Sequence, residues 1–279
     1  MRRTITGFSN PAVKQLRLLR DKKHRRAQGR FLAEGLRLLT DAREAGRLPE
    51  MLVMAQGREP HPLLVALEDA VEQAGGEIVE TSAAILARIT GKDNPQAVAG
   101  VFAEFDCSLE RIDRSRAPIW LVAQALRDPG NLGTLLRTGD AVGAGGLILI
   151  DDCADPFSVE AVRASMGAIF TQQVAQARWD AFLPWLRAGE GQLVAASLGA
   201  DALPYRAAPY AAPCFVLVGN ESRGLPPDYE AACDIRVTLP MRGRADSLNA
   251  AIAGAVLAYE ALATIAPAQG AGGGAAAGG

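Results

Sequence analysis

The sequence predicts an α/β protein in which a small α/β unit precedes a larger one built on a mostly parallel sheet. Short apolar segments of strand length alternate with helical periodicity along most of the 279 residues, a length that suits two domains. A charged stretch without sustained periodicity separates the two series, and the Ala/Gly-rich end of the chain cannot bury a core. We therefore expect domains at 1–105 and 118–265, a linker at 106–117 and a disordered tail at 266–279.

The first unit is predicted to begin with a basic amphipathic helix. Val13, Leu16 and Leu19 recur at helical spacing, basic residues occupy the opposite face, and Gly29 is expected to end this element. A short strand at 31–33 and a helix that ends near Gly46 follow. The remaining pattern predicts strands at 51–55, 77–81 and 98–103, with a helix at 61–74 and another that follows the strand at 77–81 and runs through Ile89.

Apolar segments indicate the strands of the second unit. Residues 119–123, 146–150 and 214–218 are apolar almost throughout, which is typical of parallel strands buried on both faces. Two more strands are predicted at 193–196 and 235–239. The helical segments are 131–143, 158–167 and 247–263.

The charge distribution is uneven although the net charge is only -2. Residues 1–37 hold eleven Lys/Arg and two acids, which leaves eighteen basic and twenty-nine acidic residues in the rest. Such a basic arm on an acidic protein favours a polyanionic partner that is bound through its phosphates. The charges alone also fit an ordinary solvated helix face, so the arm does not decide between these interpretations.

Several classes of protein are disfavoured by composition. The four cysteines have no Cys-x-x-Cys spacing, and His24 and His61 lie far apart in sequence, so we expect no metal site and no disulfide framework. No apolar run is long enough to span a membrane, and no secretory signal follows the basic start. These features predict a cytoplasmic protein with reduced thiols.

The first of three polar segments beside predicted strand ends covers residues 127–138. Pro129 and Gly130 predict a turn, and the amides at the following helix start are suited to an anion. Arg137 lies almost two turns into that helix, where its guanidinium could bind a phosphate in bidentate fashion. The alternative is a surface ion pair between Arg137 and Asp140 at i, i+3.

The other two segments follow the strands at 214–218 and 235–239. Residues 219–226 contain two glycines and Glu221, a pattern that suits either close approach to a ligand or a plain turn. Residues 239–249 form a long polar loop in which Asp246 or Ser247 is expected to cap the last helix. Because ligands of open α/β sheets bind at the carboxyl ends of the strands, all three segments are candidate site residues.

In this order and spacing the three segments resemble the signature motifs of the SpoU/TrmH branch of the SPOUT methyltransferases. The resemblance covers roughly residues 118–263 and includes an intermediate stretch at 162–168. The matching residues are Asn131, Gly133, Thr134, Arg137, Thr138, Gly219, Glu221, Gly224, Leu225, Leu239, Pro240, Met241, Ser247, Leu248 and Asn249.

The resemblance implies a parallel sheet closed by a C-terminal trefoil knot and an S-adenosylmethionine-dependent transfer of methyl to a ribose 2′-hydroxyl of RNA. It implies cofactor contacts, mainly through backbone, at Gly219, Asn220, Leu239, Met241 and Leu248. It also implies a catalytic set of Asn131, Arg137, Glu221, Ser247 and Asn249. Two roles for Arg137 remain open, a holder of phosphate and oxyanion or a base with an unusually perturbed pKa, and we favour the first because arginine is a poor base.

The first unit resembles, less specifically, the small ribosomal-protein-like RNA-binding domain that often precedes this catalytic domain. Residues 31–35 and 94–98 carry this likeness. The resemblance implies a homodimer, and the two-domain layout favours ribosomal RNA, 23S rRNA first, over tRNA. A non-catalytic RNA-binding or ribosome-assembly factor with the same fold is the alternative. A nucleotide-binding oxidoreductase is disfavoured because 141–152 lacks a dinucleotide fingerprint.

Overall fold

The structure, a computed structural model, describes residues 1–92 and 96–266 and divides into two compact units. The first unit contains residues 1–107, 127–137 and 154–174, and the second contains 108–126, 138–153 and the chain from 175 onward. Neither unit is continuous in sequence. The expected domain boundaries remain a prediction, and Asn94, Pro95 and residues 267–279, on which two expectations fall, lie outside the described residues.

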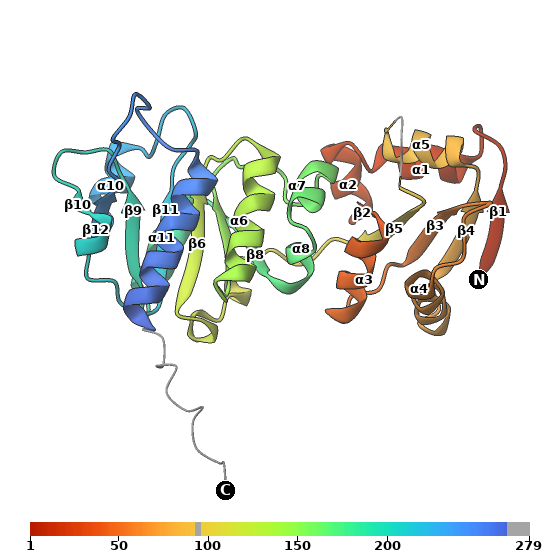
Figure 1. Ribbon diagram of the computed structural model, residues 1–279, viewed down its shortest axis with the longest axis horizontal. Helices are drawn as coiled ribbons and strands as arrows, with labels where there is room; N and C mark the ends of the chain where they lie inside the picture. Colours follow the sequence, from red (N-terminus) through yellow and green to blue (C-terminus); the bar gives the residue numbers. More distant parts are fainter. Residues whose placement is uncertain (93–95, 267–279) are drawn as a thin grey trace, which may run out of the picture. The chain divides into compact units, whose positions relative to one another are not determined.

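The described part of the first unit contains a five-stranded mixed sheet of order β1-β4-β3-β5-β2. β1, β4 and β3 run parallel, whereas β5 is antiparallel to both β3 and β2. Helices α1 and α5 cover one face, and α3 and α4 cover the other (Figure 1). The elements are β1 (Arg2–Ile5), α1 (Pro11–Leu18), α2 (Lys22–Gln28), β2 (Arg30–Glu34), α3 (Leu36–Glu44), β3 (Met51–Ala55), α4 (Pro62–Gln73), β4 (Glu77–Thr81), α5 (Ala83–Thr90) and β5 (Val98–Ala103).

The basic N-terminal segment differs from its prediction in two ways. One helix was expected, but α1 ends at Leu18 and Asp21 starts α2 by accepting hydrogen bonds from the amides of Lys23 and His24. Gly29, with φ 60°, ends α2 as predicted. Residues 2–5 form an unpredicted edge strand, because Arg2 is held by Glu68, Glu72 and Glu80 and the strand pairs with β4.

Two segments from the C-terminal half complete the first unit. Helices α7 (Val159–Ala164) and α8 (Ala168–Thr171) replace the single helix predicted at 158–167. The helix breaks because Met166 and Gly167 have φ of 50° and 95°, and a Cβ on Gly167 would lie 2.9 Å from the Asp41 carboxylate. α7 packs against β2 and α8 against α3.

An aromatic cluster and a buried ion pair hold these segments in the first unit. The Arg25 side chain is 2% exposed, and its guanidinium donates to Asp155 Oδ2 at 2.6 Å. The ring of Phe31 lies 5.0 Å from that of Phe157 between centroids. The clustered aromatic residues are Phe31, Phe102, Phe105, Phe157 and Phe170.

The described part of the second unit contains a seven-stranded sheet of order β10-β12-β9-β11-β6-β7-β8. The registers from β10 to β7 are parallel, which confirms the predicted α/β class with a parallel sheet. The strands are β6 (Ile119–Gln124), β7 (Gly146–Ile150), β8 (Gln173–Ala177), β9 (Gln192–Ala196), β10 (Leu203–Pro204), β11 (Cys214–Val218) and β12 (Ile235–Thr238). The helices are α6 (Pro129–Ala141), which begins in the first unit, α9 (Trp179–Arg187), α10 (Pro227–Ala231) and α11 (Ala250–Ile265).

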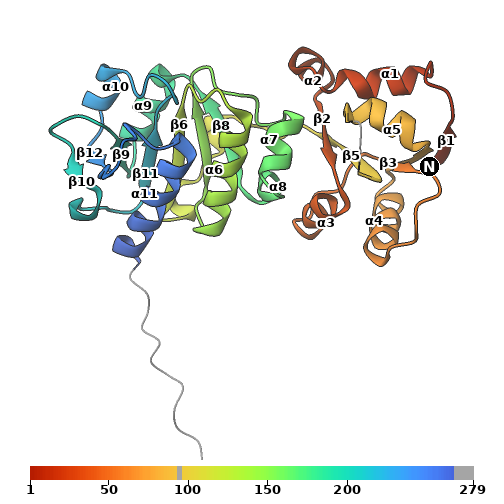
Figure 2. The ribbon, with the colours of Figure 1, turned by 45° about the horizontal axis from the view of Figure 1, so that its top comes forward.

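Both faces of this sheet are buried. Trp120 and Phe215 pack with Phe182 and Leu186 of α9 on one face. α11 lies along β11 and β6 (Figures 1 and 2). The chain thus leaves β12 near one edge and returns to cover the middle of the sheet, as the expected knotted fold requires.

The segment predicted as a linker is partly core. Short 3-10 turns form at Leu109–Arg111 and Arg114–Arg116, and both Leu109 and Ile112 are buried in the core of the second unit. The Arg114 guanidinium donates to the carbonyl of Leu186 at 2.9 Å. The sequence did not predict that these residues are buried, because the segment is charged and lacks sustained periodicity.

The four thiols are unpaired in the structure. Burial raises the pKa of Cys107, Cys214 and Cys233 to about 12 and that of Cys153 to about 11. At pH 8 these thiols are therefore protonated, whereas an unfolded thiol has a pKa of about 8.5 and is partly ionised. We expect a thiol-reactive reagent to label the native protein slowly and the urea-unfolded protein quickly. Rapid labelling of the native protein at pH 8 would contradict this burial.

Among the described residues no helix is long and apolar enough to cross a membrane.

Candidate functional site

A cavity of about 340 Å³ opens in the second unit at the carboxyl ends of β9, β11 and β12. Its volume falls in the range of small-molecule sites, about 300–1,000 Å³. Four parts of the chain line it, and two of them are motifs singled out from the sequence. The lining residues include Ser197, Leu198, Val218, Gly219, Asn220, Glu221, Leu225, Glu230, Val237, Leu239, Met241, Ser247, Leu248, Ala250 and Ala253.

The loop after β11 is closed by its own backbone. The amides and carbonyls of Asn220 and Gly224 bond reciprocally, at 3.1 and 2.9 Å. A Cβ on Gly219 would lie 2.4 Å from the carbonyl carbon of Gly224, so no larger residue fits there without opening the loop. The glycines of this motif therefore bring two backbone stretches together at the wall of the cavity.

The Asn220 side chain is occupied in holding this loop. Its amide nitrogen donates to the carbonyl of Ala125 at 2.8 Å, which fastens the loop to the end of β6. Its amide oxygen accepts from the backbone amides of Ser222 and Arg223. Glu221 is exposed beside it at the mouth of the cavity.

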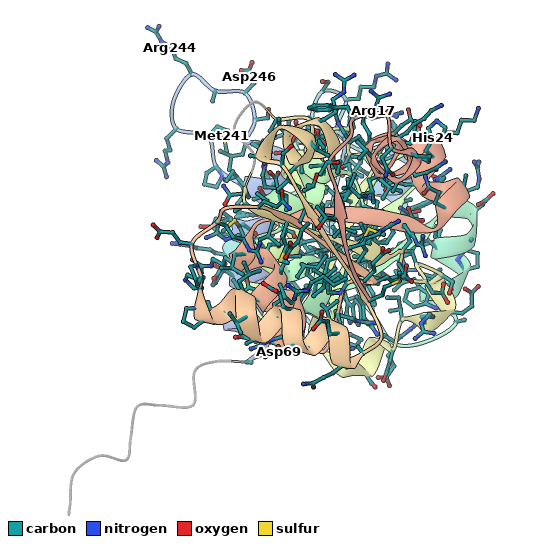
Figure 3. The ribbon with its side chains drawn as sticks, turned by 90° about the vertical axis from the view of Figure 1, so that its right-hand side faces the viewer. Arg17, His24, Asp69, Met241, Arg244 and Asp246 are labelled. Carbon is teal, nitrogen blue, oxygen red and sulfur yellow. The ribbon has the colours of Figure 1, made fainter. Side chains whose placement is uncertain are left out.

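The loop from Leu239 to Asn249 supplies the opposite wall. Leu239, Met241, Ser247 and Leu248 line the cavity. Figure 3 shows Met241 near the base of this loop and Arg244 on its outer bend. Asn249 does not line the cavity.

The cap of the last helix is a correction to the prediction. Neither Asp246 nor Ser247 starts α11. Instead the amide oxygen of Asn249 accepts from the backbone amides of Ala251 and Ile252, at 2.9 and 3.2 Å. The loop is therefore longer than expected, and Asn249 sets where it ends.

Two polar residues of the cavity were missed by the sequence reasoning. The Ser197 hydroxyl, 6% exposed, donates to Glu230 Oε2 at 3.0 Å and accepts from the amide of Gly199. Glu230 lies on α10, outside every motif. Pairing of β9 with β11 and β12 brings these residues to the same wall of the cavity. No local sequence pattern therefore predicts them.

Asn131 and Arg137 lie on α6, in the part that belongs to the first unit. The amide of Asn131 donates to Asp128 Oδ1 at 2.6 Å, so the start of α6 is capped by a carboxylate rather than open to an anion. Gly133 has no room for a side chain, because a Cβ would lie 2.5 Å from that of Ala164. Arg137 is exposed on the same helix.

The donors of the cavity suit a ligand with an apolar ring system and polar ends. Val218, Leu225 and Leu239 form apolar wall, whereas Ser197, Glu230 and the backbone of the 219–224 loop offer hydrogen bonds. This combination fits S-adenosylmethionine, which joins an adenine, a ribose and a charged amino acid. No cluster of three or more metal-ligating side chains occurs among residues 1–92 and 96–266.

Comparisons with known proteins identify the family. Residues 118–259 match the SpoU rRNA Methylase family, and residues 10–100 match the MRM3-like substrate binding domain. The chain is 30% identical over 256 residues to the 23S rRNA (guanosine(2553)-2′-O)-methyltransferase RlmP of Bacillus subtilis, covering 91% of this chain and 97% of that protein.

Solved structures agree equally well. An AdoMet-bound rRNA methyltransferase from Sinorhizobium meliloti superposes with a TM-score of 0.86 at 38% identity, covering 93% of this chain and 97% of that one. The AdoMet complex of the SpoU methyltransferase AviRb from Streptomyces viridochromogenes gives 0.81 at 27% identity, covering 91% of this chain and 97% of that one. The chain therefore belongs to the SpoU rRNA methylase family.

Proposed function

We propose that this protein transfers methyl from S-adenosylmethionine to a ribose 2′-hydroxyl of ribosomal RNA, with 23S rRNA as the first candidate. The observation that carries the proposal is the cavity between the loop after β11 and the loop before α11. Seven of the ten site residues predicted from the sequence line it. Similarity to a 23S rRNA 2′-O-methyltransferase along 97% of its length supports the choice of RNA.

The cavity holds the cofactor mainly through backbone in this proposal. Bound S-adenosylmethionine supplies an electrophilic methyl group on a sulfonium. The backbone at Gly219, Leu239 and Leu248 recognises the adenine end, and Met241 adds apolar contact. Asn220 acts indirectly, because its side chain keeps the loop closed.

Arg137 is proposed to hold the phosphate and the developing oxyanion of the acceptor ribose. A guanidinium has five donors and a pKa above about 12, so it stabilises negative charge and does not serve as a base at neutral pH. Asn131, Glu221 and Ser247 belong to the same proposed catalytic set. Asn249 positions Ser247 through the cap of α11.

We assign the roles of the domains according to the predicted boundaries. Residues 1–105 would bind RNA, 106–117 would connect the domains, and 118–265 would carry the methyltransferase chemistry. The match of residues 10–100 to a substrate binding domain supports this assignment. The predicted compartment is the cytoplasm, where ribosomal RNA of bacterial type is made.

Transfer of a labelled methyl group tests the proposed function. The full chain would be incubated with methyl-labelled S-adenosylmethionine and, separately, undermethylated 23S rRNA, small-subunit rRNA and total tRNA. We expect label in one 23S nucleotide, released as a 2′-O-methyl nucleoside after digestion. Label in tRNA alone would show that tRNA is the substrate instead of rRNA. Absence of label in every fraction would refute the enzymatic proposal.

Gly219→Ala is expected to weaken S-adenosylmethionine binding about tenfold, a loss of roughly 1.4 kcal/mol. The added methyl group would collide with the carbonyl of Gly224 and open the loop that forms the cavity wall. Calorimetric titration with the cofactor measures the effect. Gly243→Ala is the matched control, since a Cβ at Gly243 meets nothing within 4 Å. Equal affinities of the two variants would exclude Gly219 from the cofactor site.

We also propose a homodimer whose interface is the exposed side of α11. Ile252 and Tyr259 are 48% and 53% exposed, which is unusual for two large apolar side chains on one helix. Light scattering of the wild type should give twice the 29.3 kDa chain mass. Ile252→Glu with Tyr259→Glu should give the monomer mass. A monomeric wild type at micromolar concentration would contradict the proposal.

A further inference from the structure

A basic surface of the first unit is not used by the proposed methyl transfer. α1 and α5 lie side by side there, and two hollows of about 880 and 440 Å³ adjoin at the shared residues Arg17 and Arg88. We call this surface the α1–α5 groove and define it by Phe8, Lys14, Arg17, Arg20, Arg88 and Lys92.

Most cations of the groove lack an acidic partner. Among the described residues, Lys14, Arg17, Arg20 and Arg88 form no ion pair. Asp21 lines the groove, but its carboxylate accepts the backbone amides that start α2. Several arginines elsewhere in the unit have carboxylate partners, namely Arg2, Arg3, Arg25, Arg30 and Arg58. In a chain with more acids than bases, this concentration of unpaired cations points to an anionic ligand.

One arginine of the groove, Arg20, is held in place. Gly91 has φ +74°, and a Cβ there would lie 2.1 Å from the Arg20 guanidinium carbon, so the guanidinium rests directly on backbone. The turn that carries Arg20 is fixed from inside, because buried Arg25 donates to the carbonyls of Leu19 and Arg20 at 2.9 and 2.8 Å. A cation ordered before binding loses less entropy when it binds a phosphate.

The groove ends at an exposed aromatic ring. Phe8 is 58% exposed and lines the smaller hollow with Lys14, Arg17 and Arg88. Figure 3 shows Arg17 on the opposite side of this unit from Asp69 of α4, whose helix also carries Glu68 and Glu72. α4 thus carries three acids and no Lys or Arg, whereas the α1–α5 groove is basic and has the exposed ring of Phe8.

We propose that the α1–α5 groove binds a single-stranded segment of RNA, with its phosphates on the arginines and a base stacked on Phe8. Cations beside an exposed aromatic ring are what single-stranded nucleic acid requires, because every base has a face to stack. An acidic protein would use the cations but not the ring. The inference rests on the proposed function in taking RNA as the partner, and it adds where and in what form RNA is held.

Binding of a labelled oligouridylate of about 12 nucleotides to the full chain tests the groove. Arg17→Glu with Arg88→Glu should weaken binding more than tenfold and flatten the dependence of log K on log[salt] by about 0.7 for each phosphate that the variant no longer binds. Arg17→Lys with Arg88→Lys should keep most of the affinity. Phe8→Ala should weaken binding of the single strand about tenfold and leave an RNA duplex of equal length unaffected.

Arg178→Glu is the charge control, because that arginine is 81% exposed on the second unit. Binding by the double Glu variant equal to that of Arg178→Glu would overturn the inference, as would oligoglutamate competing as well as RNA. In the methyl-transfer assay the double variant should raise KM for rRNA at unchanged kcat and unchanged S-adenosylmethionine affinity. A wild type that binds oligouridylate through the groove but methylates no RNA would refute only the proposed function.

Discussion

Asp155→Ala is expected to lower the free energy of unfolding by about 3–5 kcal/mol, which is a large part of the stability of a domain. The Arg25 guanidinium, 2% exposed, would lose its carboxylate partner and remain a buried charge. The carbonyls of Leu19 and Arg20 would still accept from it, but its Nε has no hydrogen-bond partner. Urea unfolding followed by circular dichroism measures the change.

Two variants separate the lost charge pair from other effects of this substitution. Asp155 also accepts from the amide of Phe157 at 3.0 Å, and Asp155→Asn keeps an oxygen for that bond while removing the charge. We expect Asn to be intermediate between wild type and Ala. Arg25→Met with Asp155→Leu should lose less than Asp155→Ala alone, because no unpaired charge remains buried. An unchanged unfolding midpoint for Asp155→Ala would show that the pair does not hold the unit together.

Strands with fully apolar sequences were predictable, whereas two edge strands with mixed sequences were missed. Cys214–Val218 is buried at every position, so its composition alone indicates a central parallel strand. Gln173–Ala177 and Arg2–Ile5 lie at sheet edges and carry polar residues that point to solvent or to acidic partners. Their strand conformation comes from pairing with distant segments, which no local pattern records.

Local sequence patterns also do not show to which compact unit a residue belongs. Periodicity places residues 154–174 with the C-terminal half, where they lie in sequence. The structure groups them with the first unit through Phe157, Phe170 and the ion pair of Asp155 with Arg25. The sequence around a phenylalanine does not indicate which of the two cores it packs into.

Part of the cavity lining was predictable from its glycine motif. Gly219 was singled out because glycine lets the backbone approach a ligand closely, and in the structure a Cβ there would collide with the backbone of Gly224. Ser197 and Glu230 were not predictable, because each is an ordinary polar residue until β9 and α10 bring them together. Asn249 was predicted as part of the catalytic set, and its role as the cap of α11 appears only in the helix geometry.

Arg137→Ala is expected to lower the rate of methyl transfer by about 10²–10³-fold, the usual loss when one oxyanion-stabilising donor is removed. Cofactor affinity should not change, since Arg137 lies on α6 and does not line the cavity. Single-turnover transfer to rRNA measures the rate, and calorimetry measures cofactor binding. Arg178→Ala, which removes an exposed arginine from the second unit, is the control for loss of charge.

The conservative variant and the pH profile decide how Arg137 acts. A holder of phosphate and oxyanion should keep part of its effect in Arg137→Lys, because the charge remains although the bidentate geometry is lost. Its removal should lower the rate at every pH and leave the shape of the profile unchanged. A base with a depressed pKa would behave differently, because the wild-type rate would rise through that pKa and Arg137→Ala would abolish the rise. A flat loss across pH 6–9 therefore supports electrostatic stabilisation, and wild-type turnover by Arg137→Ala would remove both roles.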